Sequence, residues 1–423
     1  DSIFIGQGVG PLAISGLAIT FPLMNLSTAF GTLVGAGAAT MLSVLLGQQH
    51  YKAANKVLGN VVSLNIIIGL VFMAVALIFI DPILYFFGAS ENTLPYAKEY
   101  IQIILYGNII THLYFGLNAA MRSTGFPKKA MALTIFTVVL NTVLDPLFIF
   151  KFNMGIKGAA WATVIAQAVA MLIVMSHFNN RTRAIHFDKG IVRMHWKVAK
   201  NSLIVGMGPF LMNAAACIVT LFINQQLRDY SGDLGIGAYG ICNRFIFMFI
   251  MICMGLNQGM QPIASYNFGA KLYGRLQEVV KLTAICAVAV TTTGFLVAEL
   301  FPVTLVKMFT SDPALIEEAA HGLRVSFMFY PIVGFQMVTS NFFRSIGYAG
   351  TSIFLSLTRQ LIFLLPLLYI LPQFFGLGGI WASMPLADVI SCVVSASMMM
   401  YHLNKFKKQN LSDASPAQQG QTN

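Results

Sequence analysis

Charged residues are scarce in this chain, and their scarcity excludes a soluble globular protein. Only 10% of the 423 residues are charged, whereas 57% are hydrophobic. A soluble domain of this size could not present that composition to water without aggregating. Apolar runs long enough to cross a hydrocarbon core of about 30 Å recur along the chain, for example 61–80, 133–150, 158–175 and 284–300. Lipid must therefore solvate most of the surface.

Cysteine is also sparse, and no pattern in the sequence indicates a cofactor or a metal enzyme. The five cysteines lie in apolar segments without the spacing of a metal site or an evident disulfide partner. We interpret them as small core residues. No HExxH motif occurs, and no strand precedes the glycines at 6, 8 and 10, so a phosphate-binding loop is not indicated either. We predict no cofactor and no enzymatic activity.

Acidic residues are fewer than basic ones, which leaves a formal charge of +11. Nucleic acid is not the expected partner, because the basic residues are strung between apolar runs instead of being gathered on one soluble face. They fall in alternate connections between the runs, as Lys52, Arg122, Arg181, Lys271 and Lys405 illustrate. By the positive-inside tendency, those connections are cytoplasmic.

Counting the apolar segments predicts an all-α polytopic protein of the cytoplasmic (inner) membrane. The chain has no initiator Met and no signal peptide, and it begins with Asp1 entering the short apolar stretch 2–5, so we expect most of a first helix to be missing. Further spans are predicted at 12–46, 57–80, 97–121, 129–150, 157–178, 201–226, 234–268, 279–300, 322–343, 350–371 and 376–402. Completing the first span gives twelve transmembrane helices with both termini in the cytoplasm.

The two halves of the sequence repeat one another. Gly37 and Gly47 return 222 residues later as Gly259 and Gly269, and the segment Arg122-Ser-Thr-Gly125 returns as Arg344-Ser-Ile-Gly347. Near the end of each half the offset is 220, where Pro146 matches Pro366 and Trp161 matches Trp381. Six helices have been duplicated. An even number of spans per half predicts two six-helix bundles related by an axis along the membrane normal, with a central cleft.

The repeat also defines four segments. We predict an N-terminal lobe at 1–178, a basic cytoplasmic linker at 179–200, a C-terminal lobe at 201–402 and a polar cytoplasmic tail at 403–423, disordered after Lys408. The linker carries six basic residues. Amphipathic pieces at 90–100 and 312–324 are interpreted as external loop helices that precede the fourth and tenth spans.

Few charged side chains lie inside the predicted spans, where each costs roughly 2.5 to 3.5 kcal/mol on insertion scales. Asp145 is the most informative. Asn141 lies four residues earlier on the same helix face, and Pro146 cannot donate its backbone hydrogen bond and so frees carbonyl oxygens nearby. The result is an oxygen-rich spot in apolar surroundings. Spacing alone leaves two interpretations open: a functional carboxylate, or one that caps or pins two helices.

The remaining charged residues are less specific. Asp1 either faces a cleft or is polar only because the chain begins there. Arg359 is interpreted as a helix-end or lipid-headgroup contact, and Asp388 and Arg244 as buried polar ties.

Several of these segments together resemble the multidrug and toxic compound extrusion (MATE) family. The resemblance covers essentially the whole chain and rests on motifs in order: Asp1-Ser-Ile-Phe-Ile-Gly6, Gly16-Leu-Ala-Ile with Pro22, Gly47-Gln, Arg122-Ser-Thr-Gly125, Asn141-x3-Asp145-Pro-Leu-Phe-Ile149, and Gly155-Ile-Lys-Gly-Ala-Ala-Trp-Ala-Thr163. It implies two bundles around a V-shaped cleft. It also implies export of amphipathic, often cationic, small molecules against an inward flow of Na⁺ or H⁺ by alternating access.

The resemblance assigns a cation-coupling site to the N-terminal lobe, formed by Asp1, Asn141, Asp145 and Thr163. Carboxylate, amide and hydroxyl oxygens suit a hard cation such as Na⁺, and two nearby carboxylates repel unless a cation or a proton neutralises one. Some family members carry a carboxylate in the seventh span, but here the segment 209–224 has none. The repeat places Leu361 and Leu365 opposite Asn141 and Asp145, so we expect coupling in the N-terminal lobe only, in a monomer.

Two rival functions remain open at this point. A flippase or exporter of lipid-linked sugars has a related two-lobed fold, but such clefts tend to carry several cationic residues, and here only Arg244 and Arg359 are candidates. An intramembrane aspartyl protease built on Asp1 and Asp145 would need flanking motifs such as Gly-x-Gly-Asp, which are absent.

Overall fold

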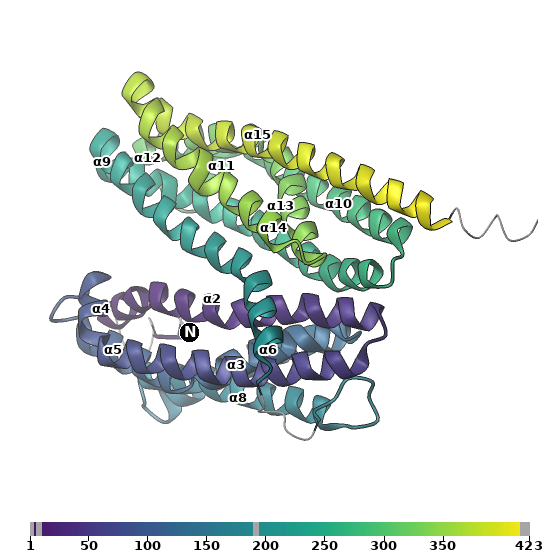
Figure 1. Cartoon of the computed structure of the whole chain (residues 1–423). Coiled ribbons are helices and arrows are strands. Elements are labelled where there is room, and N and C mark those ends of the chain that lie inside the picture. Colours follow the sequence, from purple (N-terminus) through teal and green to yellow (C-terminus); the bar gives the residue numbers. More distant parts are fainter. Residues whose placement is uncertain (1–3, 6–10, 189–193, 415–423) are drawn as a thin grey trace, which may run out of the picture. The chain divides into compact units, whose positions relative to one another are not determined.

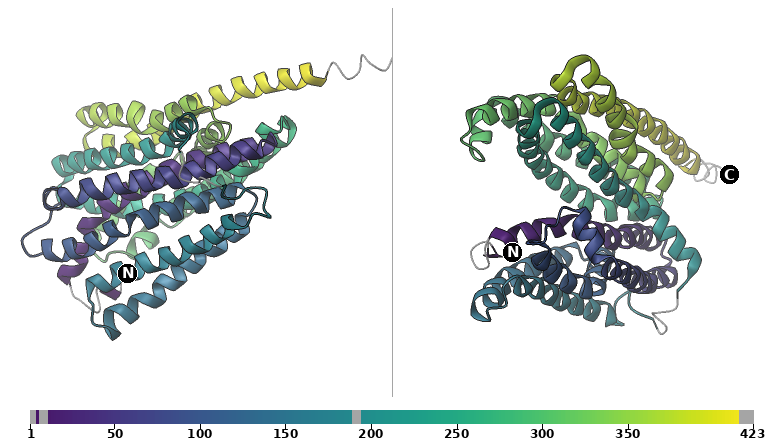
Figure 2. Two further views of the ribbon diagram at one scale, coloured as in Figure 1. Left: turned by 60° about the horizontal axis from the view of Figure 1, so that its bottom comes forward. Right: turned by 90° about the vertical axis from the view of Figure 1, so that its left-hand side faces the viewer.

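Long helices dominate the computed structural model, which describes residues 4–5, 11–188 and 194–414 (Figure 1). The chain divides into two compact units, Asp1–Phe210 and Leu211–Asn423. In each unit several long helices run side by side, as the further views in Figure 2 show. The division falls after Phe210, which lies within the seventh predicted span. The domain boundaries at 178, 200 and 402 stay predictions.

The first unit is built from the apolar segments that the sequence predicts. Its described helices are α2 (Pro11–Gly47), α3 (Tyr51–Ile78), α4 (Ile80–Phe86), α5 (Leu94–Tyr106), α6 (Asn108–Ser123), α7 (Pro127–Pro146), the π-helix η1 (Leu147–Lys151), α8 (Ile156–Asn179) and the start of α9 (Trp196–Gly269). Pro127 begins α7 because proline has no N–H to leave unsatisfied at a helix start and its φ is already helical.

The second unit contains the rest of α9, which Gly232 (φ 62°, ψ −148°) divides into two helices. It continues with α10 (Tyr273–Leu300), α11 (Pro302–Lys307), α12 (Pro313–Phe327), α13 (Tyr330–Ser345), α14 (Ala349–Leu357), the π-helix η2 (Thr358–Leu364) and α15 (Leu365–Ala414). Helix α15 runs past Lys408, so its residues up to Ala414 are helical, which corrects the prediction of disorder for that part of the tail.

The two predicted loop helices are helical, but each packs into the core of its unit. The segment 90–100 belongs mostly to α5, which buries Ala97, Tyr100 and Ile101 in the core of the first unit and leads directly into α6 at Gly107. The segment 312–324 belongs to α12, which likewise leads into α13. Amphipathicity indicated an interfacial helix, but the apolar face packs against other helices.

The duplication inferred from the sequence is visible in the backbone. Gly125 and Gly347 both adopt positive φ, at 94° and 80°. Gly155, before α8, has φ 58° and ψ −137°, and its counterpart Gly376 inside α15 has φ 57° and ψ −135°. These conformations favour glycine, because a Cβ would be strained there. Matching turns therefore join matching helices in both units.

A pair of matching hydrogen bonds reinforces this similarity. The Ser43 hydroxyl donates to the Ser123 carbonyl at 3.0 Å, and the Ser265 hydroxyl donates to the Ser345 carbonyl at 2.6 Å. Both serines and both carbonyls are 222 residues apart. The prediction of two related helical bundles is confirmed.

Eight of the helices in the described part of the chain are long and apolar enough to cross a membrane. One of them, Ala349–His402, contains two spans, because Gly376 breaks it. The fourth and tenth predicted spans correspond to the broken pairs α5–α6 and α12–α13. Most of the first predicted span lies outside the described residues. The chain is an all-α polytopic membrane protein.

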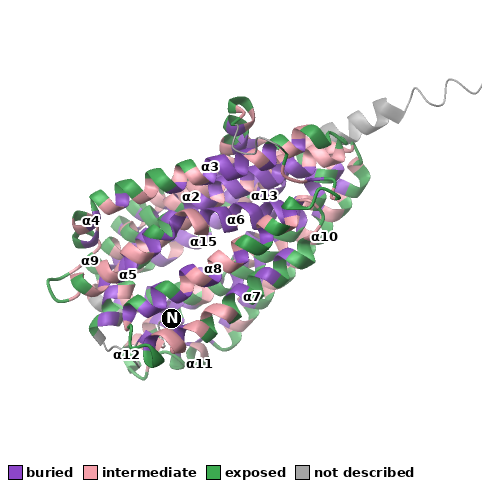
Figure 3. Ribbon diagram, turned by 90° about the horizontal axis from the view of Figure 1, so that it is seen from below, coloured by how far each residue is buried: buried purple, intermediate pink, exposed green. Residues whose placement is uncertain are grey.

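Figure 3 colours the ribbon by burial, and buried residues are dense along α3 and α6 of the first unit. In the first unit α2, α3 and α6 contribute Leu42, Leu58 and Leu117, all fully buried. Helix α7 is different, because most of its side chains are exposed and only Ala130, Leu133, Thr137 and Asp145 are buried. A carboxylate is thus one of the few α7 side chains directed inward.

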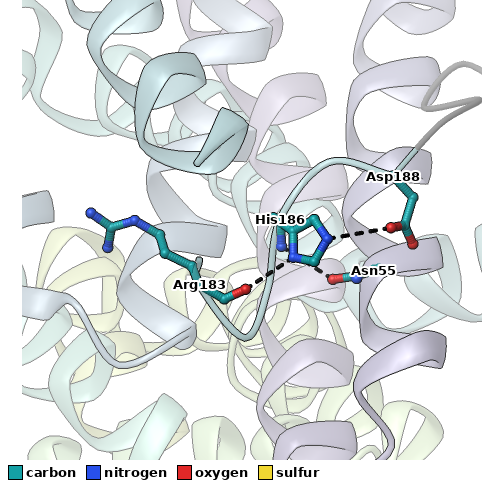
Figure 4. A network of polar contacts seen from close by, with 4 residues as sticks. All are labelled: Asn55, Arg183, His186 and Asp188. Atoms are coloured by element: carbon teal, nitrogen blue, oxygen red, sulfur yellow. Dashed lines mark hydrogen bonds and ion pairs between the residues drawn. The ribbon is translucent and has the colours of Figure 1, made fainter. Parts of the chain in front are cut away.

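The predicted linker attaches to the first unit through α3. The Asn55 carboxamide oxygen accepts from the backbone N–H of His186 at 3.2 Å, and the His186 ring lies 2.9 Å from the Arg183 carbonyl and 3.5 Å from Asp188 (Figure 4). Asn60 pairs with the backbone of His195 through both its oxygen and its nitrogen. Because α9 begins at Trp196, the last residues of the predicted linker are helical.

Candidate functional site

The end of α7 is an irregular piece of helix that carries a buried carboxylate. Asp145 has no exposed surface, and it is followed by Pro146 and then by the π-helix η1. Proline removes one backbone hydrogen bond, and π-type turns widen a helix and often occur at functional sites. The local sequence therefore places Asp145 where the regular hydrogen-bond ladder is interrupted.

Three of the four predicted site residues lie together. The Asn141 side-chain nitrogen lies 3.5 Å from Asp145 Oδ1 and 3.2 Å from Thr163 Oγ1, so the amide bridges α7 and α8. The Thr163 hydroxyl donates to the Ala159 carbonyl at 3.1 Å. Asp1, the fourth predicted residue, lies outside the described residues.

Tyr100 is a neighbour that the sequence interpretation missed. It is 1% exposed, and its hydroxyl hydrogen-bonds the Thr163 side chain. The interpretation of 90–100 as an external loop helix had placed it away from the lobe. The apolar face of α5 turns Tyr100 inward, where a buried tyrosine needs a partner for its hydroxyl. That apolar face was the signal in the sequence that could have placed Tyr100 in the core.

The combined ligand set is suited to a small hard cation. Asp145 supplies a carboxylate, Asn141 an amide oxygen, and Thr163 and Tyr100 hydroxyl oxygens. Hard cations prefer such oxygen ligands, and one carboxylate provides the charge that attracts them into apolar surroundings. The same carboxylate can bind a proton, since a neutral carboxyl group is less costly than a charged one when it is desolvated.

The second unit holds its own buried carboxylate in a different way. Asp388 on α15 is 3% exposed and lies 2.5 Å from the Arg359 Nε on η2. The interpretation of Asp388 as a buried polar tie is confirmed. The interpretation of Arg359 as a helix-end or headgroup contact is wrong, because its guanidinium turns into the unit to pair with Asp388.

Arg244 also differs from its prediction as a buried polar tie. Its side chain is exposed, and its guanidinium lies over the Phe309 ring at 5.6 Å from the centroid. A guanidinium over an aromatic face is favourable without burial. Of these two arginines of the second unit, Arg359 therefore contacts a carboxylate and Arg244 contacts an aromatic ring.

The counterparts of Asn141 and Asp145 are apolar. Leu361 and Leu365 pack against the hydrophobic core cluster that contains Tyr330, Val333 and Trp381. These leucines supply no oxygen ligand. Of the two units, the first carries the ligand set that the sequence predicted.

Known proteins resemble this chain along nearly its whole length. The MatE family model matches residues 1–147 and 207–370. The multidrug export protein MepA of Staphylococcus aureus strain MRSA252 is 28% identical over 408 residues, which cover 95% of this chain and 88% of that protein. MepA of Staphylococcus haemolyticus strain JCSC1435 is 26% identical over 400 residues, with the same shares covered.

Solved structures of MATE transporters are also similar to this chain. The MATE multidrug transporter DinF-BH, solved in complex with R6G, is 35% identical and superimposes with a TM-score of 0.87 over 96% of this chain and 91% of its own. A crystal structure of a MATE in the bent conformation has a TM-score of 0.91 at 22% identity, over the same shares, which shows the likeness of fold. The chain therefore belongs to the MatE family of multidrug efflux proteins, and it is a multi-pass membrane transporter, not an enzyme.

Proposed function

We propose that this transporter is a secondary active antiporter that exports amphipathic, often cationic, small molecules in exchange for inward-moving Na⁺ or H⁺. The observation that carries the proposal is the buried Asp145 with Asn141 and Thr163 beside it. A charged carboxylate in a membrane span is costly unless it is used, and Asn141 links this one to the hydroxyl of Thr163. The R6G complex of DinF-BH supports a small organic substrate.

In this proposal, binding of the cation and binding of the exported molecule oppose each other. A cation that enters from outside binds Asp145, Asn141, Thr163 and, in the predicted site, Asp1, and favours a conformation with weak substrate affinity. Release of the cation inside restores substrate affinity. The coupling needs only a difference in cation affinity between two conformations.

We also propose that the protein works as a monomer and has a fixed orientation in the membrane. The basic connections should face the cytoplasm of a cell with this protein in its inner membrane, and both termini of the twelve-span protein should lie there. Single cysteines introduced at the exposed Gln48 and Ser90 should label from opposite sides, with Gln48 cytoplasmic. Labelling of both positions from one side would contradict the predicted span count.

The decisive experiment on coupling compares substrate binding with gradient-driven efflux in proteoliposomes for Asp145→Asn. The amide keeps the shape and much of the hydrogen bonding, so a helix-pinning role predicts normal efflux. A coupling role predicts that substrate still binds, while efflux no longer responds to either a Na⁺ or a pH gradient. Asp81→Asn is the matched control, because Asp81 pairs with Lys98 at a half-exposed position. Normal efflux in Asp145→Asn would return Asp145 to a structural role.

A further inference from the structure

Oxygen-bearing side chains continue along α7 beyond the site just described. Thr134, Thr137, Asn141 and Asp145 follow one another at intervals of three or four residues, which places them on one face of the helix. Most other α7 side chains are apolar and exposed. Together with Tyr114, these residues are called the oxygen stripe below.

Tyr114 on α6 joins the two threonines. Its side chain is 4% exposed, and its phenol oxygen lies 3.5 Å from Thr134 Oγ1 and 3.4 Å from Thr137 Oγ1. Thr137 is itself buried. The stripe therefore runs along the contact between α6 and α7, from the buried Tyr114 and Thr137 to Thr134, which is exposed.

The threonine hydroxyls are oriented by their own backbone. Thr134 donates to the carbonyl four residues earlier at 3.0 Å, and Thr137 does so at 2.7 Å. Thr163 at the coupling site makes the same bond at 3.1 Å. Because each proton is directed to a carbonyl, each oxygen presents lone pairs to its surroundings, as a cation ligand must.

The spacing of these oxygens also suits a cation. Distances of 3.4 and 3.5 Å are long for hydroxyl hydrogen bonds, which are most often about 2.7 to 2.8 Å. Two oxygens that each lie about 2.4 Å from one ion, at a right angle, are about 3.4 Å apart. The threonines and Tyr114 are thus spaced more like neighbouring ligands than like tight hydrogen-bond partners.

The stripe extends from the coupling site toward the basic end of α7. At 1.5 Å per residue, the distance along the axis from Asp145 to Thr134 is about 16 Å, roughly half of a 30 Å hydrocarbon core. Lys128 and Lys129 begin the helix, and we predict that end to be cytoplasmic. The stripe therefore covers much of the distance that a cation released inward would have to travel.

At the 220-residue offset, the second unit has apolar side chains at the four α7 positions of the stripe. By the repeat, the counterparts of Thr134, Thr137, Asn141 and Asp145 are Phe354, Leu357, Leu361 and Leu365. Hydroxyl groups do meet at the matching helix contact of the second unit, where Ser340 on α13 hydrogen-bonds Ser352 and Ser356 on α14. Among the described residues at this contact, only the hydroxyls of the first unit lie on a helix that also carries a buried carboxylate, which connects them with the coupling site.

We propose that the oxygen stripe is the inward exit route of the coupling cation, with Tyr114, Thr137 and Thr134 as successive transient ligands after Asp145 and Asn141. The inference rests on the proposed function. A route needs oxygens that bind weakly and in series, and neutral hydroxyls at these spacings meet that need. The stripe serves to move the cation and does not determine its equilibrium affinity.

The test separates the exchange rate from affinity in the full chain. Thr137→Val and Tyr114→Phe each remove one oxygen and keep the shape, and Thr142→Val is the matched control. Thr142 lies exposed on the same helix, off the stripe, and bonds only its own backbone at 2.9 Å among the described contacts. Equilibrium affinity is measured with Na⁺ or by pH titration in detergent. The exchange rate is measured in proteoliposomes, as tracer Na⁺ exchange at equal concentrations or with an internal pH dye.

The double variant Thr137→Val with Tyr114→Phe should slow exchange at least about tenfold, which corresponds to about 1.4 kcal/mol of barrier, while affinity stays within about twofold. Thr142→Val should change neither quantity. A slowdown with tracer Na⁺ alone identifies a Na⁺ route, and a slowdown with the pH dye alone identifies a proton route. Exchange as fast as in Thr142→Val, or an equal loss of affinity and rate, would overturn the proposal.

Asp145→Asn, run in parallel, distinguishes the two failures. If it still binds and exchanges the cation, the proposed coupling site is wrong. If it loses both properties while the stripe variants behave like Thr142→Val, the coupling site stands and the exit route alone is wrong.

Discussion

Among the described residues, the side chains beside the buried carboxylate of the first unit are neutral and oxygen-bearing, whereas the second unit pairs its carboxylate with a guanidinium. Around Asp145, the amide of Asn141 and the hydroxyl of Thr163 add ligand atoms without adding charge. Beside Asp388, Arg359 supplies a positive charge 2.5 Å away. Both arrangements adjoin a π-helical segment, η1 in one case and η2 in the other.

This difference suggests a division of roles between two copies of one ancestral bundle. A guanidinium is always protonated and is attached to the chain, so the partner of Asp388 cannot be released. A site built from neutral oxygens can bind a cation and give it up. In our hypothesis the second unit keeps a permanent ion pair, while the first keeps an exchangeable one. The following variants test that contrast.

The largest expected effect is the loss of stability that Asp388→Asn should cause. The change leaves the partly buried Arg359 guanidinium without a counter-charge, which should lower the free energy of unfolding by about 3 kcal/mol. Asp145→Asn should lower it by only about 1 kcal/mol, because neutral partners can bond an amide. Thermal unfolding in detergent measures both.

A double variant is the control for this comparison. Arg359→Met with Asp388→Leu removes both charges and should unfold at least as late as the unmodified protein, because well-packed apolar pairs replace buried ion pairs without loss. An Asp145→Asn protein as unstable as Asp388→Asn would show that Asp145, too, is mainly a structural tie.

The next effect is stabilisation by the coupling ion. A cation that binds only the folded protein stabilises it by about 2.7 kcal/mol at a concentration of 100 times its Kd. If the ion is Na⁺, added salt should raise the unfolding temperature, with K⁺ as the ionic-strength control. If it is H⁺, a proton held more tightly by the folded state makes stability rise as pH falls. Asp145→Asn should lose the effect, and the Arg359/Asp388 double variant should keep it.

A smaller effect on stability is expected near a tryptophan that is buried in the second unit and exposed in the first. Trp381 is fully buried, donates its indole N–H to Glu318 at 2.8 Å and lies over Gly322, whereas its counterpart Trp161 is 41% exposed. A Cβ on Gly322 would lie 2.5 Å from the Trp381 ring. The counterpart of Gly322 in the first unit is Tyr100.

Gly322→Ala should therefore lower the free energy of unfolding by about 1 to 2 kcal/mol, since overpacking outweighs the gain of about 1 kcal/mol in helix propensity. Gly240→Ala is the control, because a Cβ there meets nothing within 4 Å, and it should be neutral or stabilising. Unfolding in detergent distinguishes the two. A stable Gly322→Ala protein would mean that Trp381 can move aside.

The smallest effect should come from Thr163→Ala. Loss of one neutral hydroxyl ligand should weaken cation affinity by about 1 kcal/mol, or about fivefold, without abolishing coupled efflux. Ser383→Ala makes the matching change in the second unit, where the hydroxyl bonds the Gly379 carbonyl at 2.7 Å. It should leave cation affinity unchanged. Equal shifts in both variants would remove Thr163 from the ligand set.

Local patterns in the sequence were sufficient to predict the membrane-spanning helices and the duplication. Hydrophobic runs of about 20 residues must become spans whatever their neighbours are, because an unpaired backbone in lipid is too costly. The shared face of Asn141 and Asp145 follows from helix geometry alone. Gly125 and Gly347 adopt the same turn conformation in both copies, because positive φ favours glycine whatever its neighbours are.

Only the tertiary structure decided which side chains from different helices meet. Amphipathicity marks the apolar face of α5 but not what covers it, so Tyr100 was expected at a surface and lies instead beside Thr163. Arg359 and Asp388 are 29 residues apart, and no periodicity connects them. Such contacts depend on how helices rotate and pack against each other, which is set by the complementary shapes of many side chains at once.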